Sequence, residues 1–288
     1  ALLRRVALAR ARALEIAGRQ DEAFAAYVAL SGVAEARADR DIELAALLAR
    51  ATLRAGQSSQ HDASEGQALA ERALTLAREL GDRAAEAKAL WCHSLSALFR
   101  GRVDDTIAFG EASLAIALEL GLTEQEAQTR LEIGHAGLMS GRTAVSAAHL
   151  SIAADRFRAE GNLAMLSDAL ASDAFRLFEE GRLEEALART REALVISEET
   201  DNLWGQGFAL EVVGYVAMER GELGAAVATW EDGIERATRA GYAGAAVNPG
   251  TALAAAYGMR GAADRAFSVA ERARSVAEGL DLTLAELT

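Results

Sequence analysis

The sequence has very little proline, cysteine or aromatic character: one proline and one cysteine in 288 residues, with 5% aromatic residues. A lone cysteine, Cys92, excludes an intramolecular disulfide and is typical of a reducing compartment. The residues that favour strands are sparse, whereas the abundant Ala, Leu, Glu and Arg are strong helix formers. The composition therefore predicts an all-α protein.

Long apolar runs and an excess of positive charge are also missing. No uncharged apolar stretch approaches the roughly 18 to 20 residues of a membrane span. Residues 1–12 carry four arginines, which interrupt any secretory signal. The net charge of −13 and the pI near 4.9 argue against direct nucleic acid binding, which needs clustered Lys and Arg. We expect a cytoplasmic protein without membrane contact, and the opening without Met favours a fragment of a longer chain.

What the sequence has in place of these features is a repeat. Glycines recur every 40 residues at Gly101, Gly141, Gly181, Gly221 and Gly261. A second series falls between them at Gly81, Gly121, Gly161 and Gly241, and Asp201-Asn202 occupies its missing place. Self-similarity at a period of 20 to 50 residues indicates a solenoid.

The segments between glycines have the 3.6-residue apolar spacing of amphipathic helices. Glycine after a helix tolerates the left-handed conformation in which many helices end. We therefore predict one solenoid domain over residues 1–288, built from about seven antiparallel pairs of an A and a B helix. The pairs lie near residues 1–37, 40–80, 83–120, 123–160, 163–200, 203–240 and 243–279.

Three irregular places interrupt this pattern. Residues 57–61 are extra to the period and predict a surface loop. Pro249 predicts a kink in the last A helix, or a start delayed to about that residue. Residues 280–288 predict either a capping helix or the start of a truncated repeat. Because this apolar tail caps the solenoid poorly, a homodimer through a terminal repeat is plausible.

Small residues at fixed places in each pair strengthen the pattern. They occur within A helices at Gly134 and Gly214, and at the opening of B helices at Ala186 and Ala226; one unit ends in Leu80-Gly81-Asp82. In these features the chain resembles the tetratricopeptide repeat (TPR) family, in the 40-residue variety found in bacterial signalling regulators. It lacks that family's aromatic residue early in helix A and the proline between units. The resemblance implies an α-α superhelix whose A helices line a concave groove that binds proteins or peptides.

Carrying the groove positions over from each turn glycine gives a mostly apolar and aromatic set of candidate partner-binding residues: Trp91, Leu95, Leu98, Leu131, His135, Leu138, Phe175, Phe178, Glu211, Tyr215 and Met218. Residues within each helix are spaced so that they share one face. Such a groove suits an amphipathic helix or an apolar peptide. The alternative is that these side chains only pack against the neighbouring A helix.

Catalytic, metal and cofactor signals are weak. No two of the four histidines are spaced i, i+4, and the adjacent Cys92 and His93 diverge on a helix. The paired glutamates fall at predicted helix ends, where they are solvated. Phosphate-binding, nucleophile-elbow and dinucleotide motifs are missing. We expect no catalytic residues, no metal site and no cofactor.

The sequence thus favours a non-catalytic protein- or peptide-binding scaffold, as part of a larger bacterial signalling or transcriptional regulator. One alternative is a sensor for a small metabolite, sugar or signalling peptide, with a small-molecule effector held in the middle units. A hydrolase or transferase is the third alternative, which a cleft with convergent His and carboxylate groups would favour.

Overall fold

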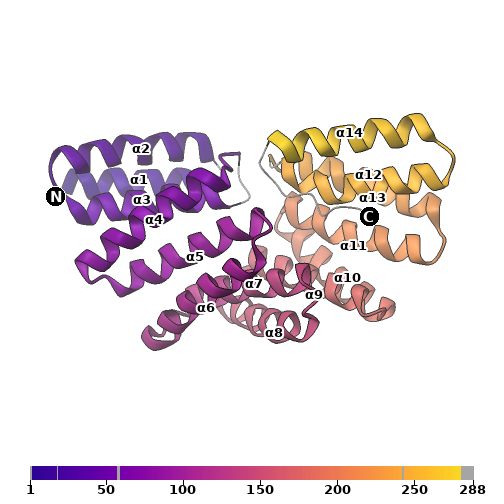
Figure 1. The fold of residues 1–288 in the computed structure, drawn as a ribbon, viewed down its shortest axis with the longest axis horizontal. Helices are drawn as coiled ribbons and strands as arrows, with labels where there is room; N and C mark the ends of the chain where they lie inside the picture. Colours follow the sequence, from indigo (N-terminus) through magenta and orange to yellow (C-terminus); the bar gives the residue numbers. More distant parts are fainter. Residues whose placement is uncertain (1, 18, 57–58, 242, 280–288) are drawn as a thin grey trace. The chain divides into compact units, whose positions relative to one another are not determined.

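A computed structural model describes residues 2–17, 19–56, 59–241 and 243–279 as an all-helical chain (Figure 1). The helices, 13 to 18 residues long, form seven consecutive pairs. They are α1 (Leu2–Ile16), α2 (Gln20–Ala36), α3 (Arg40–Ala55), α4 (Ala63–Leu80), α5 (Arg83–Phe99), α6 (Val103–Leu120), α7 (Thr123–Met139), α8 (Thr143–Glu160), α9 (Leu163–Glu179), α10 (Leu183–Glu199), α11 (Leu203–Glu219), α12 (Leu223–Arg239), α13 (Val247–Met259) and α14 (Ala263–Gly279). A short 3-10 helix, η1 (Ala243–Ala246), precedes α13.

The glycine series marks the turns between helices, as the sequence predicts. Nine of these glycines have φ between 66° and 89°, the left-handed region that a side chain disfavours. Asp201, which takes the place of glycine in the second series, has φ 51°. At the turn after α4, the Gly81 amide donates to Arg78 O at 3.2 Å and the Asp82 amide to Ala77 O at 2.9 Å. These bonds satisfy carbonyls that the ending helix leaves unpaired.

Several A helices begin at a polar residue that caps them. The side chains of Asp39, Asp82, Asn162 and Asn202 each accept a hydrogen bond from a backbone N–H three residues on. Such a bond satisfies one of the free amides of the first turn. Four B helices, α6, α8, α10 and α12, begin without a side-chain cap of this kind.

The extra loop between α3 and α4 departs in part from the sequence expectation. Residues 57–58 lie outside the described part of the chain. His61, predicted to lie in a surface loop, is 8% exposed: its Nδ1 lies 2.9 Å from Gly56 O and its ring meets Phe99 edge-on at 4.8 Å. An imidazole can pack as an apolar body while one ring nitrogen keeps a backbone partner, which is why this polar residue is buried.

The last A helix, α13, begins later than the repeat predicts and is not kinked at Pro249. Residue 242 is outside the described ranges, η1 covers residues 243–246, and α13 begins at Val247. Pro249 therefore sits in the first turn of α13, where no intrahelical partner for its missing N–H is needed. Of the two outcomes predicted for Pro249, the delayed start is the one observed. The predicted tail, residues 280–288, lies outside the described residues.

The chain divides into two compact units, one up to Glu132 and the other from Ile133. Unit 1 contains an apolar cluster centred on Tyr27 and Leu53 and another on Leu90 and Ile116. Unit 2 contains a cluster of α9, α10 and α11 residues around Val212, and one around Trp230. None of the described helices combines the length and the apolar character that a membrane span requires. A single continuous solenoid domain over residues 1–288 stays a prediction.

Candidate functional site on helices α9 and α11

Helices α9 and α11 of unit 2 bring five of the predicted residues together. The Tyr215 ring meets Phe175 edge-on at 5.6 Å and stacks on Phe178 at 5.4 Å, measured between centroids. Both separations fall in the range of favourable aromatic pairs. Each of the three rings is only partly buried, and so is Met218 one turn further along α11. We call Phe175, Phe178, Glu211, Tyr215 and Met218 the aromatic face.

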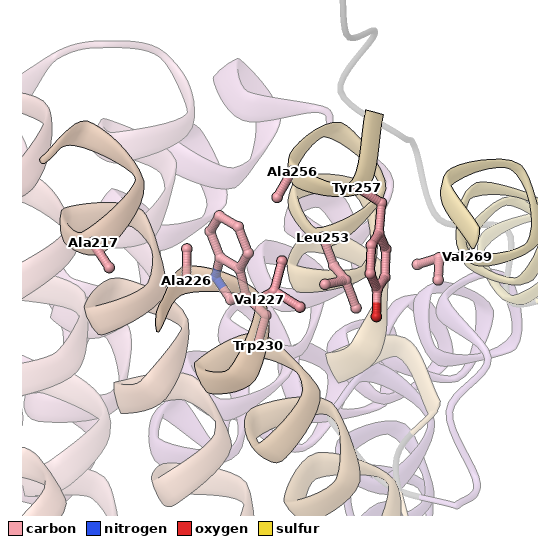
Figure 2. Close-up of a cluster of buried hydrophobic side chains, with 8 residues drawn as sticks. All are labelled: Ala217, Ala226, Val227, Trp230, Leu253, Ala256, Tyr257 and Val269. Carbon is pink, nitrogen blue, oxygen red and sulfur yellow. The ribbon is translucent and has the colours of Figure 1, made fainter. Parts of the chain in front are cut away.

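A buried tryptophan from the paired B helix supports this face. Trp230 of α12 is 0% exposed, its ring meets Tyr215 edge-on at 5.3 Å, and its Nε1 donates to Glu211 O at 3.1 Å. Figure 2 shows its indole between α11, which carries Ala217, and α13, which carries Leu253. A Cβ at Gly214 would overlap the indole, so only glycine lets α11 and Trp230 approach this closely. The positions of Tyr215 and Glu211 thus depend on α12.

Glu211 is the one buried acid of the aromatic face, and its side chain has an unusual environment. It is 7% exposed, and the Tyr215 hydroxyl donates a hydrogen bond to its carboxyl group. Burial raises the pKa of Glu211 to about 8, since desolvation disfavours the charged form. Burial and the neighbouring Glu211 raise the pKa of the Tyr215 hydroxyl above its usual value. At neutral pH both groups are therefore mainly neutral.

His135 of α7 lies in a separate polar cluster of unit 2. Its Nε2 is 2.7 Å from Ser172 Oγ and 3.8 Å from Asp168 Oδ1. Ser172 is fully buried and donates its hydroxyl proton to Asp168 O at 2.9 Å. In a catalytic triad the serine donates to one imidazole nitrogen and the acid accepts from the other. Here serine and acid both face Nε2, and the serine proton points to a backbone carbonyl, so the triad geometry is not met.

The predicted residues of unit 1 present little side-chain surface. Trp91, Leu95, Leu98 and Leu131 are each 7% exposed or less. The Lys88 Nζ lies 3.8 Å from the centroid of the Trp91 ring and donates to Gln128 Oε1 at 3.1 Å. Little of the surface of these side chains is therefore open to a partner. Leu138, which belongs to unit 2, is partly buried.

Sequence reasoning did not select several residues that belong to these surroundings. Trp204 and Phe208, with ring centroids 5.2 Å apart, continue the face of α11 toward its start. They lie seven and three residues before Glu211, so helical spacing alone could have found them. Asp168 and Ser172 lie seven and three residues before Phe175 on α9, so the same spacing could have found them. Trp230 carried no such signal, because its role depends on contacts between helices.

Two cavities of the structure are lined by residues other than those of the aromatic face. A cavity of about 350 Å³ lies on α3 and α4, and one of about 380 Å³ on α12, α13 and α14. Neither is lined by a predicted binding residue. Within the part of the chain that the structure describes, no three His, Cys, Asp or Glu side chains are grouped so that they could hold a metal ion.

The fold defines a class of protein, the TPR-like α-α solenoids, and comparison with solved structures confirms this part of the sequence expectation. No protein-family model matches the chain, and no curated protein matches it significantly. The apo form of RapI is similar over 96% of this chain and 97% of its own, with a TM-score of 0.71 and 14% identity.

Two further similar structures hold a bound factor or peptide. A Rap protein complexed with competence and sporulation factor has a TM-score of 0.66 and 12% identity, over 97% of this chain and 99% of that one. NprR in complex with its cognate peptide NprX has a TM-score of 0.69 and 13% identity, over 96% and 82%. At these identities the likeness shows a shared fold.

Proposed function

We propose that the chain is a non-catalytic scaffold that binds a peptide, or a peptide-like segment of a partner protein, on the aromatic face. The observation that carries this proposal is the set of three partly buried rings with Met218 on two neighbouring A helices. Aromatic and methionine side chains are typical of interface centres, and the aromatic rings bury much area at low entropic cost. The similar structures that hold competence and sporulation factor or NprX support a peptide as the partner.

The chemistry of the described residues supports binding rather than catalysis. His135, Ser172 and Asp168 are the residues closest to a catalytic arrangement, but the serine is fully buried and bonded to a backbone carbonyl. A nucleophile needs a base that takes its proton and a path for the substrate. We therefore extend the proposal to a role without a reaction, within a bacterial signalling regulator.

A small-molecule sensor remains the alternative to a peptide-binding scaffold. Small ligands are usually held in concave pockets that bury most of their surface. Neither of the two cavities noted above is lined by a residue of the aromatic face, which favours an extended partner over a small effector. The cytoplasmic location and a homodimer through a terminal repeat stay predictions.

A selection from a phage-displayed library of random heptapeptides on the immobilised full chain tests the proposal. We expect enriched peptides whose binding is weakened at least tenfold by Phe178→Ala combined with Tyr215→Ala. Phe267→Ala is the matched control, because Phe267 is 71% exposed on α14. Circular dichroism checks that the double variant keeps its helicity, and the single variant Phe178→Ala serves if it does not. Failure to enrich any peptide, or unchanged binding by the folded variants, would overturn the proposal.

A further inference from the structure

We infer that Glu211 anchors a basic side chain of the bound peptide, whose alkyl stem lies across the rings of Phe178 and Tyr215. This inference rests on the proposed function and specifies the chemistry of its ligand. Its basis is a buried carboxyl group, an aromatic surface beside it, and the lack of a cation paired with that carboxyl group among the described residues.

The acids beside the aromatic face form no ion pair with a cation of the described residues. The charged side chains that act on the Tyr215 hydroxyl are Glu211 and Glu179, and no lysine or arginine of the described ranges forms an ion pair with either acid. Arg176 of α9 is already held by Asp173 at 2.7 Å and Glu180 at 2.7 Å. A buried acid is stable in its charged form only when it is paired. The charged form of Glu211 therefore has no cationic partner among the described residues, and a ligand can supply one.

The aromatic rings suit the rest of a basic side chain. Lysine and arginine bury their methylene stems on apolar surface while the charged end reaches a polar partner. A cation over an aromatic ring gains further from the negative face of the ring. Within unit 1 the protein makes this contact itself, since the Lys88 ammonium group lies 3.8 Å from the centroid of Trp91. Among the residues that the structure describes, no such cation lies over the rings of the aromatic face of unit 2.

Binding of a cation at Glu211 has a consequence for protons. In the free protein, burial raises the pKa of Glu211 to about 8, so the group is mainly protonated at neutral pH. A cation beside the carboxylate lowers that pKa, so that binding releases a proton. As pH increases toward 8, the affinity for the peptide should therefore rise by up to about tenfold per pH unit. Above pH 8 the affinity should level off. The Tyr215 hydroxyl stays protonated throughout, because its pKa is raised, which leaves Glu211 as the source of the proton.

The experiment uses the full chain and the heptapeptides enriched in the selection. Each peptide is resynthesised with citrulline in place of arginine, or acetyl-lysine in place of lysine, which removes the charge and keeps the shape. Isothermal titration calorimetry at pH 7 in phosphate and in Tris, whose ionisation enthalpies differ, counts the protons released. Glu211→Gln keeps the size of the side chain and removes its charge, and Glu219→Gln is the control on an exposed position of the same helix.

We expect the enriched peptides to contain a basic residue whose neutralisation weakens binding at least tenfold. With the parent chain, binding should release close to one proton. Glu211→Gln should bind the charged peptide at least tenfold more weakly, release no proton and no longer distinguish charged from neutral peptides, while Glu219→Gln behaves as the parent. Tight peptides without a basic residue, or charged peptides that Glu211→Gln binds unchanged, would overturn this inference and leave the proposed function standing. A selection that enriches nothing overturns both.

Discussion

Helix α5 of unit 1 and helix α11 of unit 2 are separated by three repeats in the sequence. They place side chains of different charge and burial at equivalent positions. The positions lie 120 residues apart in sequence, and α5 fills them with Lys88, Trp91, Leu95 and Leu98, whereas α11 fills them with Phe208, Glu211, Tyr215 and Met218. In α5 a cation covers a mostly buried ring, while in α11 a buried acid lies beside a partly exposed one. The repeat determines where a side chain lies, and the residue type determines whether it completes the core or remains available to a partner.

A second difference concerns how the A and B helices of a pair share space. In unit 1, Ser94 of α5 is fully buried and donates to Thr106 O at 2.8 Å, and the B-helix residue in the place of Trp230 is Gly110. In unit 2, Gly214 makes room for Trp230. The pair in unit 1 thus consists of two small residues, whereas the pair in unit 2 combines the smallest residue with the largest.

Trp230→Ala should have the largest effect, because it removes a fully buried indole and its bond to Glu211 O. We expect the free energy of unfolding to fall by about 3–5 kcal/mol. Trp91→Ala in unit 1 should cost less, since the Trp91 indole N–H has no hydrogen-bond partner among the described residues. Urea unfolding followed by circular dichroism measures both, and equal losses would show that the two tryptophans support their units alike.

Glu211→Gln should change how stability depends on pH. The folded pKa of about 8 lies above the ordinary value of 4.5, so the folded state binds the extra proton between these values. The stability that the protonated carboxyl group contributes is fully present below about pH 4.5, and it is lost by up to about 1.4 kcal/mol per pH unit as pH rises from there to about 8. The variant should lose this dependence and be more stable than the parent at pH 8. Urea midpoints from pH 5 to 9 that fall equally in both proteins would contradict the prediction.

Gly214→Ala should destabilise unit 2 by about 1–3 kcal/mol, because the added methyl overlaps the Trp230 ring. Adding Trp230→Thr creates the pairing that Ala174 and Thr190 have one repeat earlier. The double variant should therefore lose less than the two single losses added together. Ser94→Ala, at the equivalent place in unit 1, should cost only about 1 kcal/mol for its hydrogen bond to Thr106. If the loss of unfolding free energy in the double variant equals the sum of the losses in Gly214→Ala and Trp230→Thr, positions 214 and 230 do not share space.

Lys88→Met should have the smallest effect of the four. The methionine keeps an apolar stem over Trp91 and removes the charge. A cation beside an aromatic ring contributes about 0.5–1 kcal/mol to the free energy of unfolding. The shift in urea midpoint should be the same at low and high salt if the contact is shielded from solvent. A loss as large as that of Trp91→Ala would mean that the charge, rather than packing, holds this ring.

Most of the fold could be predicted because its signals are local. Glycine at a fixed period marks helix ends by its backbone conformation, and even Asp201 follows it with a positive φ. The burial of His61 could not be predicted, because burial of a loop residue depends on what packs over it, here Phe99. Helical spacing placed Phe175, Phe178 and Tyr215 on facing A helices, but Trp230 beneath them could not be found from α11 alone. Its contact exists only because Gly214, on another helix, leaves the space.

The fit between Gly214 and Trp230 also bears on how such repeats can be recombined. A crossover in the turn at Asp201 transfers α11 and α12 together and keeps both partners. A crossover at Gly221 separates them, and would set Trp230 against the Ala174 or Ser94 type of A helix, where a side chain occupies the space of the indole. Chimeras, whether arising by duplication or built in the laboratory, should therefore tolerate exchange of whole helix pairs and reject exchange of single helices.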